Sequence, residues 1–484
     1  MSAPVLKNYI NGKWVESKSS ETLDATNPAT GEVHAKVPLS TSADVDAAVT
    51  AAKDAFESWR RVPPVQRARY LFKLKALLEE HSREIAELCT RDHGKTLAES
   101  LNDLGRGIEN VEHACGIPSL LMSQNLEDVA TGIDCSVTRQ PMGVFAAITP
   151  FNFPPMVPFW FLPYAIATGN TFVLKTSEQV PLTWMRIAEL IEQTGLPAGV
   201  FNLVHGAKEV VNGLCTHPDV VGVSFVGSSK VARHVYETCA QHGKRVQALG
   251  GAKNHLLILP DAEMGPSVQN TADSAYGCAG QRCLAASVVV AVGDAYEPVR
   301  AGLVEAAKAV KLGDGLKPDT TMGPVISQAA KERILGYIET GLKEGAELLV
   351  DGRDASVPGY EGGYWVGATL FDKVKPGMKI ATEEIFGPVL SLVHVESLDE
   401  AIELMNGSEY GNAASIYTTN GKAVREFKYR AGPAMLGVNI GVAAPMAFFP
   451  FGGSKGSFFG DVKAHGPDAV EFFTDRKVVI SRFF

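Results

Sequence analysis

One short segment of the sequence combines residue types that can do chemistry, GCAGQRCL at residues 277–284. A cysteine thiolate is a strong nucleophile, and the fixed positive charge of Arg282 next to Cys283 favours the thiolate form. The small residues of this segment allow a backbone or a ligand to approach closely. On this segment alone, however, a buried structural cysteine on a glycine-loosened helix is the commoner situation. The rest of the chain has to decide whether Cys283 is catalytic or structural.

Length and composition predict a multi-domain globular protein. The chain has 484 residues, of which 45% are hydrophobic and 20% charged, and 47 are glycine. Because one hydrophobic core rarely serves more than roughly 250 to 300 residues, we expect two or more domains. The net charge of −9 argues against a nucleic-acid partner. Anionic ligands would therefore be held by single Lys or Arg side chains and by helix N-termini.

The seven cysteines are odd in number and scattered, without the paired spacing of a metal site or a disulfide framework. We therefore expect free thiols in a reducing cytoplasm and no bound metal. The N-terminal residues carry no apolar run followed by a cleavage site, so we expect no signal peptide. Residues 143–173 contain no charge, but five prolines interrupt them. This stretch indicates buried core and a cleft wall, not a membrane span.

The N-terminal part of the chain begins with a predicted hairpin and a predicted helix. Residues 7–15 (KNYINGKWV) have Asn11-Gly12 as a two-residue turn between short apolar runs. Apolar residues spaced three or four apart predict a helix over 45–59. We expect Ser42 to cap this helix and Pro63-Pro64 to end it.

Two further helical patterns follow. The first runs from 71 to 88 and stops near Gly94, a suitable C-terminal cap. The second, over 101–115, contains Arg106 between two glycines. Each interior glycine costs about 1 kcal/mol relative to alanine, so we expect another part of the chain to approach closely there. Arg106 lies off the apolar stripe, and periodicity alone makes it an ordinary solvated arginine.

From residue 143 onward, short apolar runs alternate with helical patterns. This alternation predicts a parallel sheet wrapped by helices on both faces, a doubly wound domain that binds its ligand at the carboxyl ends of the strands. The expected strands are 143–148, 171–175, 200–204 and 220–226, and the expected helices are 155–168, 181–194, 207–216 and 229–242.

Three motifs lie at such strand ends: TPFNFP from 149, KTSE from 175 and FVGSS from 225. The Lys175 ammonium and the Glu178 carboxylate together can hold the vicinal hydroxyls of a ribose, and Glu178 would repel a 2′-phosphate, which favours NAD over NADP. A surface ion pair is the equally simple alternative. Ser228 follows a glycine at the start of a helix whose free amides can hold a pyrophosphate, although such a pair is usually only a helix cap.

A second series of strands and helices begins after Gly250-Gly251. Apolar runs at 256–259, 286–292 and 388–394 predict strands of a second domain, and Cys283 comes just before the second of them. An acidic and aromatic turn (EEIFGP from 383) and a glycine-rich loop (PFGGSKG from 450) follow. The polar, weakly periodic segment 119–142 suits a projecting arm.

The six motifs TPFNFP, KTSE, FVGS, GQRC, EEIFGP and PFGGSKGS, in this order, resemble the aldehyde dehydrogenase superfamily over nearly the full length of the chain. The resemblance implies that Cys283 attacks an aldehyde carbon, while the Asn152 amide and the Cys283 backbone amide stabilise the oxyanion. Hydride then passes to a nicotinamide and leaves a thioester on Cys283. The contacts to NAD implied by the resemblance come from Thr149, Phe151, Lys175, Glu178, Ser228, Gly250, Glu384 and Phe386.

The same resemblance implies an α/β fold made of a Rossmann-like NAD-binding domain, an α/β catalytic domain and a small β oligomerisation arm. We expect the NAD-binding domain at 1–123 and 142–249 and the catalytic domain at 250–445. The arm is expected at 124–141 and 466–484. It implies a homo-oligomer, either a dimer or a tetramer.

One departure from the superfamily pattern bears on the product. Hydrolytic members carry Glu-Leu-Gly-Gly-Lys, whose glutamate is the general base for the water that cleaves the thioester, whereas this chain has Ala248-Leu249-Gly250-Gly251. Without a base worth roughly a hundredfold in rate, water is a poor acceptor and a thiol is a better one. The departure therefore favours transfer of the acyl group to coenzyme A.

This departure, together with Arg106 and Arg282, resembles the CoA-acylating methylmalonate-semialdehyde (malonate-semialdehyde) dehydrogenase branch of the superfamily. Two arginines that converge on Cys283 suit an aldehyde that bears a carboxylate, because a guanidinium grips a carboxylate bidentately. The resulting β-carboxy thioester can lose carbon dioxide, and the product would be propionyl-CoA or acetyl-CoA.

Two other functions compete with this one. A hydrolytic aldehyde dehydrogenase would need another group, such as His255, to activate water. A catalytically silent binding or structural protein on the same fold is the alternative from a different class, and an intact Cys283 and Asn152 argue against it.

Overall fold

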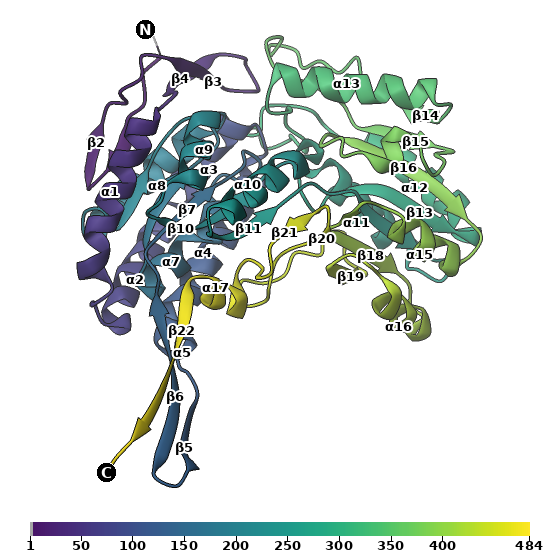
Figure 1. Ribbon diagram of the computed structural model, residues 1–484. Coiled ribbons are helices and arrows are strands. Elements are labelled where there is room, and N and C mark those ends of the chain that lie inside the picture. The colour runs from purple at the N-terminus through teal and green to yellow at the C-terminus, as the bar shows by residue number, and fades with distance from the viewer. Residues whose placement is uncertain (1–2) are drawn as a thin grey trace.

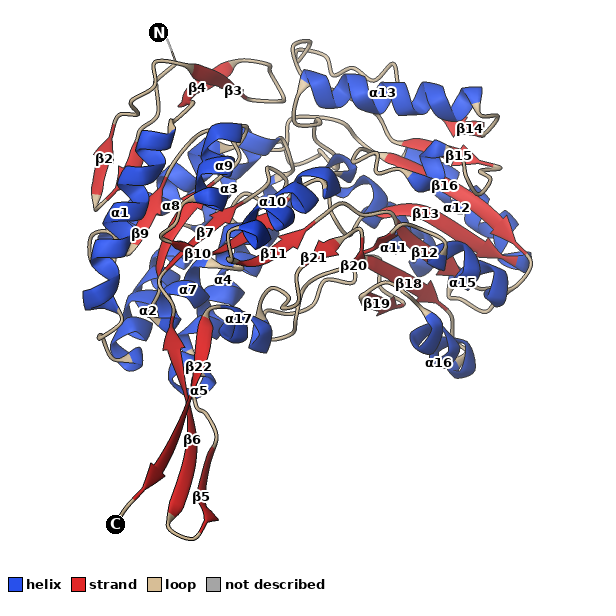
Figure 2. Cartoon of the chain, in the orientation of Figure 1, coloured by secondary structure: helices blue, strands red, loops and turns tan. Residues whose placement is uncertain are grey.

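Two separate β-sheets, each wrapped by helices, make up the body of the molecule in the computed structural model, which describes residues 3–484 (Figure 1). A thin β arm projects from the body, and the C-terminus lies at its tip (Figure 2). We refer to the eight-stranded sheet with its helices as the first unit and to the seven-stranded sheet with its helices as the second unit. No helix within residues 3–484 is both long and apolar enough to cross a membrane.

The first sheet has the order β2-β1-β9-β8-β7-β10-β11-β21. Its five central strands are parallel, and β2, β1 and β21 extend it by antiparallel pairing. The strands are β1 Asn8–Ile10, β2 Lys13–Val15, β7 Val144–Ile148, β8 Thr171–Lys175, β9 Phe201–Leu203, β10 Val220–Val226, β11 Arg245–Leu249 and β21 Phe458–Phe459. The direction of strand order reverses between β7 and β10, which is where doubly wound sheets bind ligands.

Successive side chains of β7 pack into two different hydrophobic clusters, one on each face of the first sheet. Phe145 and Ala147 of β7 belong to one hydrophobic cluster, whereas Val144, Ala146 and Ile148 belong to another. A strand buried on both faces has a continuous apolar run, as the sequence of β7 predicted. The helices of the first unit are α1 Ser42–Trp59, α2 Pro64–Glu80, α3 Ser82–His93, α4 Leu97–Cys115, α5 Ile117–Leu120, α6 Met156–Phe159, α7 Leu162–Thr168, α8 Pro181–Gln193, α9 Lys208–Thr216, α10 Ser229–Gln241 and α17 Gly466–Phe472.

The predicted hairpin and the predicted strand–helix alternation are confirmed, but three helix details were wrong. Thr41, not Ser42, is the N-cap of α1, because Thr41 is still extended and its amide donates to Asp44 Oδ2 at 2.9 Å. The pattern from 71 to 88 belongs to two helices, which His81 separates. The helix expected over 155–168 is broken into α6 and α7, since its prolines remove backbone donors.

Late segments of the chain complete the first unit. Strand β21 pairs with β11, and the Phe472 and Phe473 rings at the end of α17 pack on Phe145 at centroid distances of 5.6 and 4.8 Å. Arg245 Nη1 donates to the main-chain oxygens of Glu471, Phe472 and Thr474 at 2.7–3.0 Å. The early strands therefore depend on contacts with the far end of the sequence.

The second sheet has the order β14-β15-β16-β13-β12-β18-β19 and is parallel except for β14. The expected runs 256–259, 286–292 and 388–394 correspond to β12, β13 and β16, which are three of the seven strands. The strands are β12 Asn254–Ile258, β13 Ala286–Val292, β14 Glu347–Val350, β15 Thr369–Asp372, β16 Val389–Val395, β18 Ala413–Tyr417 and β19 Met435–Val438. The helices are α11 Met264–Tyr276, α12 Tyr296–Lys308, α13 Gln328–Lys343, α14 Lys379–Thr382, α15 Leu398–Asn406 and α16 Gly421–Arg430.

Three small sheets remain. The arm has the antiparallel order β22-β6-β5, with β5 Asn125–Ala130, β6 Ile133–Pro141 and β22 Thr474–Arg482. The other two pairs are β3 Thr22–Thr26 with β4 Val33–Pro38, and β17 Tyr410–Gly411 with β20 Ser454–Lys455. Within the C-terminal segment expected to form the arm, only β22 projects, because α17 packs into the body through Ala469 and Val470.

Candidate functional site

Cys283 lies in the loop between α11 and β13, outside any helix. A 3₁₀ turn, Gly277–Gly280, precedes it, and Cys278, Ala279 and Gly280 have φ values of 50°, 51° and 69°. Non-glycine residues rarely adopt this left-handed conformation, which other contacts must hold in place. A Cβ at Gly280 would lie 2.1 Å from the Gly387 oxygen, so only glycine fits there. The helical setting that the structural alternative assumed for Cys283 is therefore absent from the structure.

Two asparagines fix the backbone of Cys283. Asn254 Nδ2 and Asn412 Nδ2 donate to the Cys283 carbonyl oxygen at 2.9 and 2.8 Å. Sequence reasoning missed both, because neither stands in a recognisable motif: Asn254 is the first residue of β12, and Asn412 directly precedes β18. Their two hydrogen bonds leave the orientation of the Cys283 peptide little freedom.

Asn152 comes from the first unit and reaches the turn that carries Cys283. It follows β7, is 4% exposed, and its Nδ2 donates to the Gln281 oxygen at 3.1 Å. Gln281 is itself buried, and its Oε1 accepts from the Ile326 amide at 3.1 Å. The structure thus places Asn152, the proposed oxyanion donor, against the turn that leads to the proposed nucleophile.

A cavity of about 270 Å³ opens beside Cys283. Its walls are largely apolar, and they come from both units. Arg106 and Arg282 both line it, as the expectation of two arginines near Cys283 requires. The apolar part of the wall includes Phe153, Met156, Trp160, Leu284, Val442 and Phe451.

Arg106 lies at the mouth of this cavity with part of its guanidinium available. Its side chain is 29% exposed, and Nη1 pairs with Glu109 Oε2 at 2.6 Å. A further contact joins Nη2 to the Pro445 oxygen. Of the two flanking glycines, Gly107 is explained, because a Cβ there would lie 2.9 Å from Phe159 Cδ2, whereas Gly105 has open space around it. The expected close approach is thus confirmed at one of the two positions.

Arg282 is more tightly engaged than the sequence suggested. Its Nη2 pairs with Glu99 Oε1 at 3.0 Å, and its Nε donates to Cys278 Sγ at 3.3 Å. Burial alone would lower the pKa of Arg282, but the neighbouring Cys278 and Glu99 raise it. A Cβ at Gly277 would lie 2.5 Å from Arg282 Cζ, so this glycine makes room for the guanidinium. The arginine charge is therefore partly matched before any ligand binds.

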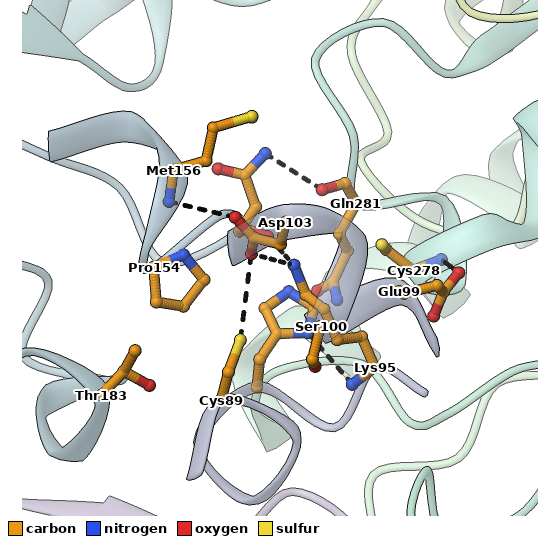
Figure 3. Close-up of polar contacts among 12 residues, drawn as sticks. Cys89, Lys95, Glu99, Ser100, Asp103, Pro154, Met156, Thr183, Cys278 and Gln281 are labelled. Atoms are coloured by element: carbon orange, nitrogen blue, oxygen red, sulfur yellow. Dashed lines mark hydrogen bonds and ion pairs between the residues drawn. The ribbon is translucent and has the colours of Figure 1, made fainter. Parts of the chain in front are cut away.

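Glu99 is a functional residue that sequence reasoning missed. Its Oε1 accepts from the Cys278 amide at 2.7 Å (Figure 3). The same oxygen accepts from Arg282, and Oε2 accepts from the Thr96 amide at 2.9 Å. The available signal was the capping box T-x-x-E at the start of α4. Glu99 thus connects a helix of the first unit to the left-handed turn of the second.

The residues proposed for a dinucleotide gather at the carboxyl edge of the first sheet. Lys175 Nζ pairs with Glu178 Oε2 at 2.7 Å, and the two side chains are 6% and 31% exposed. Burial would raise the pKa of Glu178, but the Lys175 ammonium holds it below its usual value, so Glu178 is ionised. Thr149 lies at the neighbouring strand end, and its buried hydroxyl finds no partner among residues 3–484. A buried orphan hydroxyl at a strand end fits a ligand group.

Ser228 and Gly250 lie where two loops meet. Ser228 is exposed before α10, and its side chain leaves the first-turn amides of the helix unbonded. The neighbouring Ser229 Oγ accepts from the Gly251 amide at 2.9 Å and donates to the Gly456 oxygen at 2.6 Å. A Cβ at Gly250 would lie 2.7 Å from Ser229 Oγ. Packing between the loops is thus sufficient to require glycine at 250.

Glu384 and Phe386 face the first unit across the space between the sheets. Glu384 Oε1 accepts from the Ala252 amide at 2.8 Å, and burial raises the pKa of Glu384. The Phe386 ring meets Phe151 edge to face at a centroid distance of 5.8 Å. The aromatic pair therefore joins the TPFNFP and EEIFGP motifs in space.

No carboxylate occupies the ALGG segment, and His255 does not replace one. Ala248 and Leu249 are buried at the end of β11. Asn254 and His255 are neighbours on β12, so their side chains point to opposite faces. Asn254 faces Cys283, whereas His255 lines a different cavity together with Glu383 and Glu409. Burial also lowers the pKa of His255 to about 4. His255 is therefore not placed to activate water at Cys283.

Comparison with known proteins identifies relatives over the whole chain. The model of the family described as Aldehyde dehydrogenase family matches residues 14–479. Malonate-semialdehyde dehydrogenase 2 of Geobacillus thermodenitrificans (strain NG80-2) is 55% identical over 478 residues, 99% of both chains. The crystal structure of methylmalonate-semialdehyde dehydrogenase from Oceanimonas doudoroffii has a TM-score of 0.98 at 45% identity and covers 100% of this chain and 99% of its own. The NAD⁺ complex of an aldehyde dehydrogenase from Bacillus cereus has a TM-score of 0.94 at 34% identity and covers 99% and 97%.

The protonation of Cys283 depends on burial and on one carboxylate. Burial, assisted by the negative charge of Glu384, raises the pKa of the Cys283 thiol to about 12, although hydrogen bonds from backbone amides and the Arg282 charge act in the opposite direction. Since the pKa lies above neutrality, the free protein carries Cys283 mainly as the thiol at pH 7. Nucleophilic activity then needs removal of that proton.

We predict that alkylation of Cys283 by iodoacetamide rises about tenfold per pH unit from pH 7 to 10 without a plateau, because only the thiolate reacts. In Glu384→Gln, loss of the negative charge should accelerate alkylation at pH 8 by about threefold. Peptide mass spectrometry measures the rate at Cys283, with the partly exposed Cys135 as internal reference. Glu383→Gln is the matched control. A plateau below pH 9, or slower alkylation in Glu384→Gln, would contradict this assignment.

Proposed function

The chain belongs to the aldehyde dehydrogenase family, and on this premise we propose that it is an NAD-dependent, CoA-acylating dehydrogenase that oxidises and decarboxylates malonate semialdehyde or methylmalonate semialdehyde. The proposal rests chiefly on one observation: Asn152 contacts the turn that leads to Cys283, and this turn lies beside a cavity that Arg106 and Arg282 line. The names of the relatives, at 55% identity for the protein from Geobacillus thermodenitrificans, support the substrate class.

The first step uses Cys283 and the two amides around it. Once the Cys283 thiol has lost its proton to solvent, the thiolate sulfur attacks the aldehyde carbon, and the carbonyl electron pair moves to oxygen. Asn152 Nδ2 and the Cys283 backbone amide donate to this oxyanion, and one such donor is worth roughly 3 to 4 kcal/mol in the transition state. NAD, when bound, supplies the acceptor for the hydride that leaves the same carbon. The oxyanion then collapses, and the acyl group remains on Cys283 as a thioester.

The first unit fits the proposed cofactor. Lys175 and Glu178 suit the hydroxyls of a ribose, and the ionised Glu178 disfavours a 2′-phosphate. The amides at the start of α10, beside Ser228, suit a pyrophosphate. Glu384 suits the second ribose, and Thr149, Phe151 and Phe386 suit the cleft around it. We therefore propose residues 1–123 and 142–249 as the NAD-binding domain and 250–445 as the catalytic domain.

The fate of the thioester follows from the missing base. A thioester with a carboxylate on its α carbon, as either semialdehyde would give, can release carbon dioxide, because the electron pair of the broken carbon–carbon bond enters the thioester carbonyl as an enolate. Protonation of this enolate gives the shorter acyl thioester. The thiolate of coenzyme A then attacks the acyl carbon, and Cys283 leaves. Water competes poorly, because Ala248 and Leu249 offer no general base.

The substrate carboxylate is proposed to meet Arg106 before Arg282. Each arginine is paired with one carboxylate, Arg106 with Glu109 and Arg282 with Glu99, but the Arg106 side chain is the more exposed of the two, 29% against 20%. Arg282 then adds positive potential and holds the turn, and Arg106 supplies the bidentate contact.

The arm is proposed to join copies of the chain into a dimer or tetramer. It is a three-stranded sheet that bears exposed apolar side chains, among them Leu126, Val478 and Ile480, which are 63%, 60% and 71% exposed. Apolar side chains gathered on a projecting sheet are typical of an interface. The free thiols suit a reducing compartment, so we propose the cytoplasm as the location.

Omission of coenzyme A tests the central proposal. With malonate semialdehyde and NAD alone, we predict a burst of one NADH per active site followed by a steady rate that is roughly a hundredfold lower than with coenzyme A. Cys283→Ala should abolish the burst and the turnover. Stopped-flow absorbance of NADH measures both. An undiminished steady rate without coenzyme A would establish the hydrolytic alternative, and equal rates for Cys283→Ala would exclude Cys283 as the nucleophile.

Substitution of Arg106 tests how the substrate is recognised. Arg106→Leu should raise KM for malonate semialdehyde by about 10- to 100-fold, as expected from loss of a charged hydrogen bond worth roughly 1.5 to 3 kcal/mol. KM for propanal, which has no carboxylate, should change little. Arg69→Leu, at an exposed position of α2, is the control. An equal rise for both aldehydes would show that Arg106 does not contact the carboxylate.

Charge placed on the arm tests the oligomer. The double substitution Val478→Asp/Ile480→Asp puts two carboxylates on one face of β22 without shortening the strand, since alternate residues share a face. We predict a lower molar mass in multi-angle light scattering and an unchanged far-ultraviolet dichroism spectrum. Lys477→Gln, on the opposite face, should leave the mass unchanged. A wild-type protein with the mass of one chain would contradict the proposal outright.

A further inference from the structure

Lys95 is a fully buried charge that no step of the proposed reaction uses. Its side chain and that of Asp103 are both 0% exposed, and Lys95 Nζ lies 2.9 Å from Asp103 Oδ2. The same ammonium donates to the main-chain oxygen of Asn152 at 2.6 Å and lies 4.2 Å from the centre of the Phe153 ring. Figure 3 shows Lys95 and Asp103 side by side in the centre of this cluster. Apart from Asp103 of α4, these neighbours thus belong to the segment that carries the proposed oxyanion donor.

The local sequence holds Lys95 in place from both sides. Gly94 ends α3 in a left-handed conformation, and Thr96 is the N-cap of α4, so Lys95 lies in the short link between two helices. Two glycines of the second unit, Gly315 and Gly323, pack directly on the main chain of this link, where a Cβ would lie 2.2 and 1.8 Å from the Lys95 and Gly94 oxygens. Main-chain packing around this link, and not only the side-chain rotamer of Lys95, therefore fixes where the Lys95 ammonium lies.

Together, Lys95 and Asp103 hold both ends of the Asn152–Met156 segment. Lys95 binds the Asn152 oxygen, and Asp103 Oδ1 accepts from the Met156 amide at 3.1 Å. The side chain of Asn152 in turn donates to Gln281, two residues before Cys283. A continuous path of hydrogen bonds therefore runs from the buried ion pair to the turn of the nucleophile.

Stability alone is a weak reason for such a pair. Removing two charges from water costs several kcal/mol per ion, and well-packed apolar replacements of buried ion pairs are often neutral or stabilising. Burial would lower the pKa of Lys95, but the Asp103 carboxylate outweighs burial and raises it above the usual value, so the ammonium stays charged. The Lys95 ammonium forms an ion pair with Asp103 and also donates a hydrogen bond to the main-chain oxygen of Asn152.

We propose that Lys95 is a positioning residue for the oxidation of the aldehyde: by binding the main-chain oxygen of Asn152, it holds the Asn152 side-chain amide where the oxyanion forms. The inference rests on the proposed function, because it concerns the oxyanion of that reaction. Lys95 does not itself line the cavity beside Cys283, and the proposal assigns its effect on the rate to the Asn152 peptide that it binds.

The test uses variants that remove the charge without leaving an unpaired ion. Lys95→Met/Asp103→Asn replaces the pair with neutral side chains of similar size and keeps an oxygen for the Met156 amide. The control, Thr90→Val/Ser100→Ala, removes a neighbouring buried hydrogen bond of 2.8 Å between α3 and α4 that does not touch Asn152. Thermal denaturation checks that each variant folds.

The expected result is a 30- to 100-fold lower rate of the first NADH burst in Lys95→Met/Asp103→Asn, as for partial loss of one oxyanion donor, with KM changed by less than about threefold. The control should stay within about twofold of wild type. Alkylation of Cys283 by iodoacetamide should be unchanged, since Lys95 does not act on the thiol. General loosening of the site would instead alter KM and the alkylation rate together.

A double-mutant cycle with Asn152→Ala decides the mechanism. If Lys95 acts through Asn152, then removing the Lys95–Asp103 pair in the Asn152→Ala background should lower the burst rate by less than about twofold further. Multiplicative losses, or a full wild-type rate in Lys95→Met/Asp103→Asn, would overturn the inference while leaving the proposed function intact. A wild-type protein that forms no NADH from the semialdehyde would overturn both.

Discussion

The hydrogen bond from Asn152 Nδ2 to the Gln281 oxygen is the contact on which the site depends. Asn152 stands at the end of a strand in one wrapped sheet, and Gln281 belongs to the turn that leads into the other. The apolar contact between the units is shared as well, since one hydrophobic cluster joins Phe145 of the first sheet to Ala413 and Met435 of the second. The proposed reaction needs both units, because the nucleophile Cys283 comes from the second unit and the oxyanion donor Asn152 from the first. The polar network of Lys95, Asp103, Glu99 and Arg282 surrounds this bond and fixes its two ends.

The conformational strain of this arrangement is confined to a few residues. Three successive left-handed conformations, at Cys278, Ala279 and Gly280, reverse the chain so that Cys283 faces the first unit. Strained backbone of this kind persists only where surrounding contacts over-determine it. Glu99 supplies such a contact through the Cys278 amide. Backbone strain, buried charges and an uncommon turn thus occur together where the proposed reaction takes place, whereas the two sheets consist of regular strands with apolar side chains on their buried faces.

The regularity of the sheets explains which parts of the molecule could be predicted. The alternation of apolar runs and helical patterns from residue 143 predicted four of the five parallel strands of the first sheet, because parallel strands buried on both faces are apolar throughout. The fifth, β11, was missed. The break at His81 was missed, since Leu78 and Ile85 continue the buried stripe on either side of it. The anchors of Cys283 were missed because Asn412 is 129 residues away, and the partner of Arg282 because Glu99 is 183 residues away. Only folding brings such pairs together, and no local periodicity encodes them.

The completion of the first unit by β21 and α17 has a consequence for biosynthesis. While the chain emerges from the ribosome, β11 has an open edge and Phe145 has an uncovered ring until the segments that pair with them are made. Arg245 likewise cannot form its hydrogen bonds until the carbonyl groups of Glu471, Phe472 and Thr474 have been synthesised. The nascent protein therefore carries an unfinished sheet throughout the synthesis of its second half, and it is most exposed to chaperones and to aggregation during that interval.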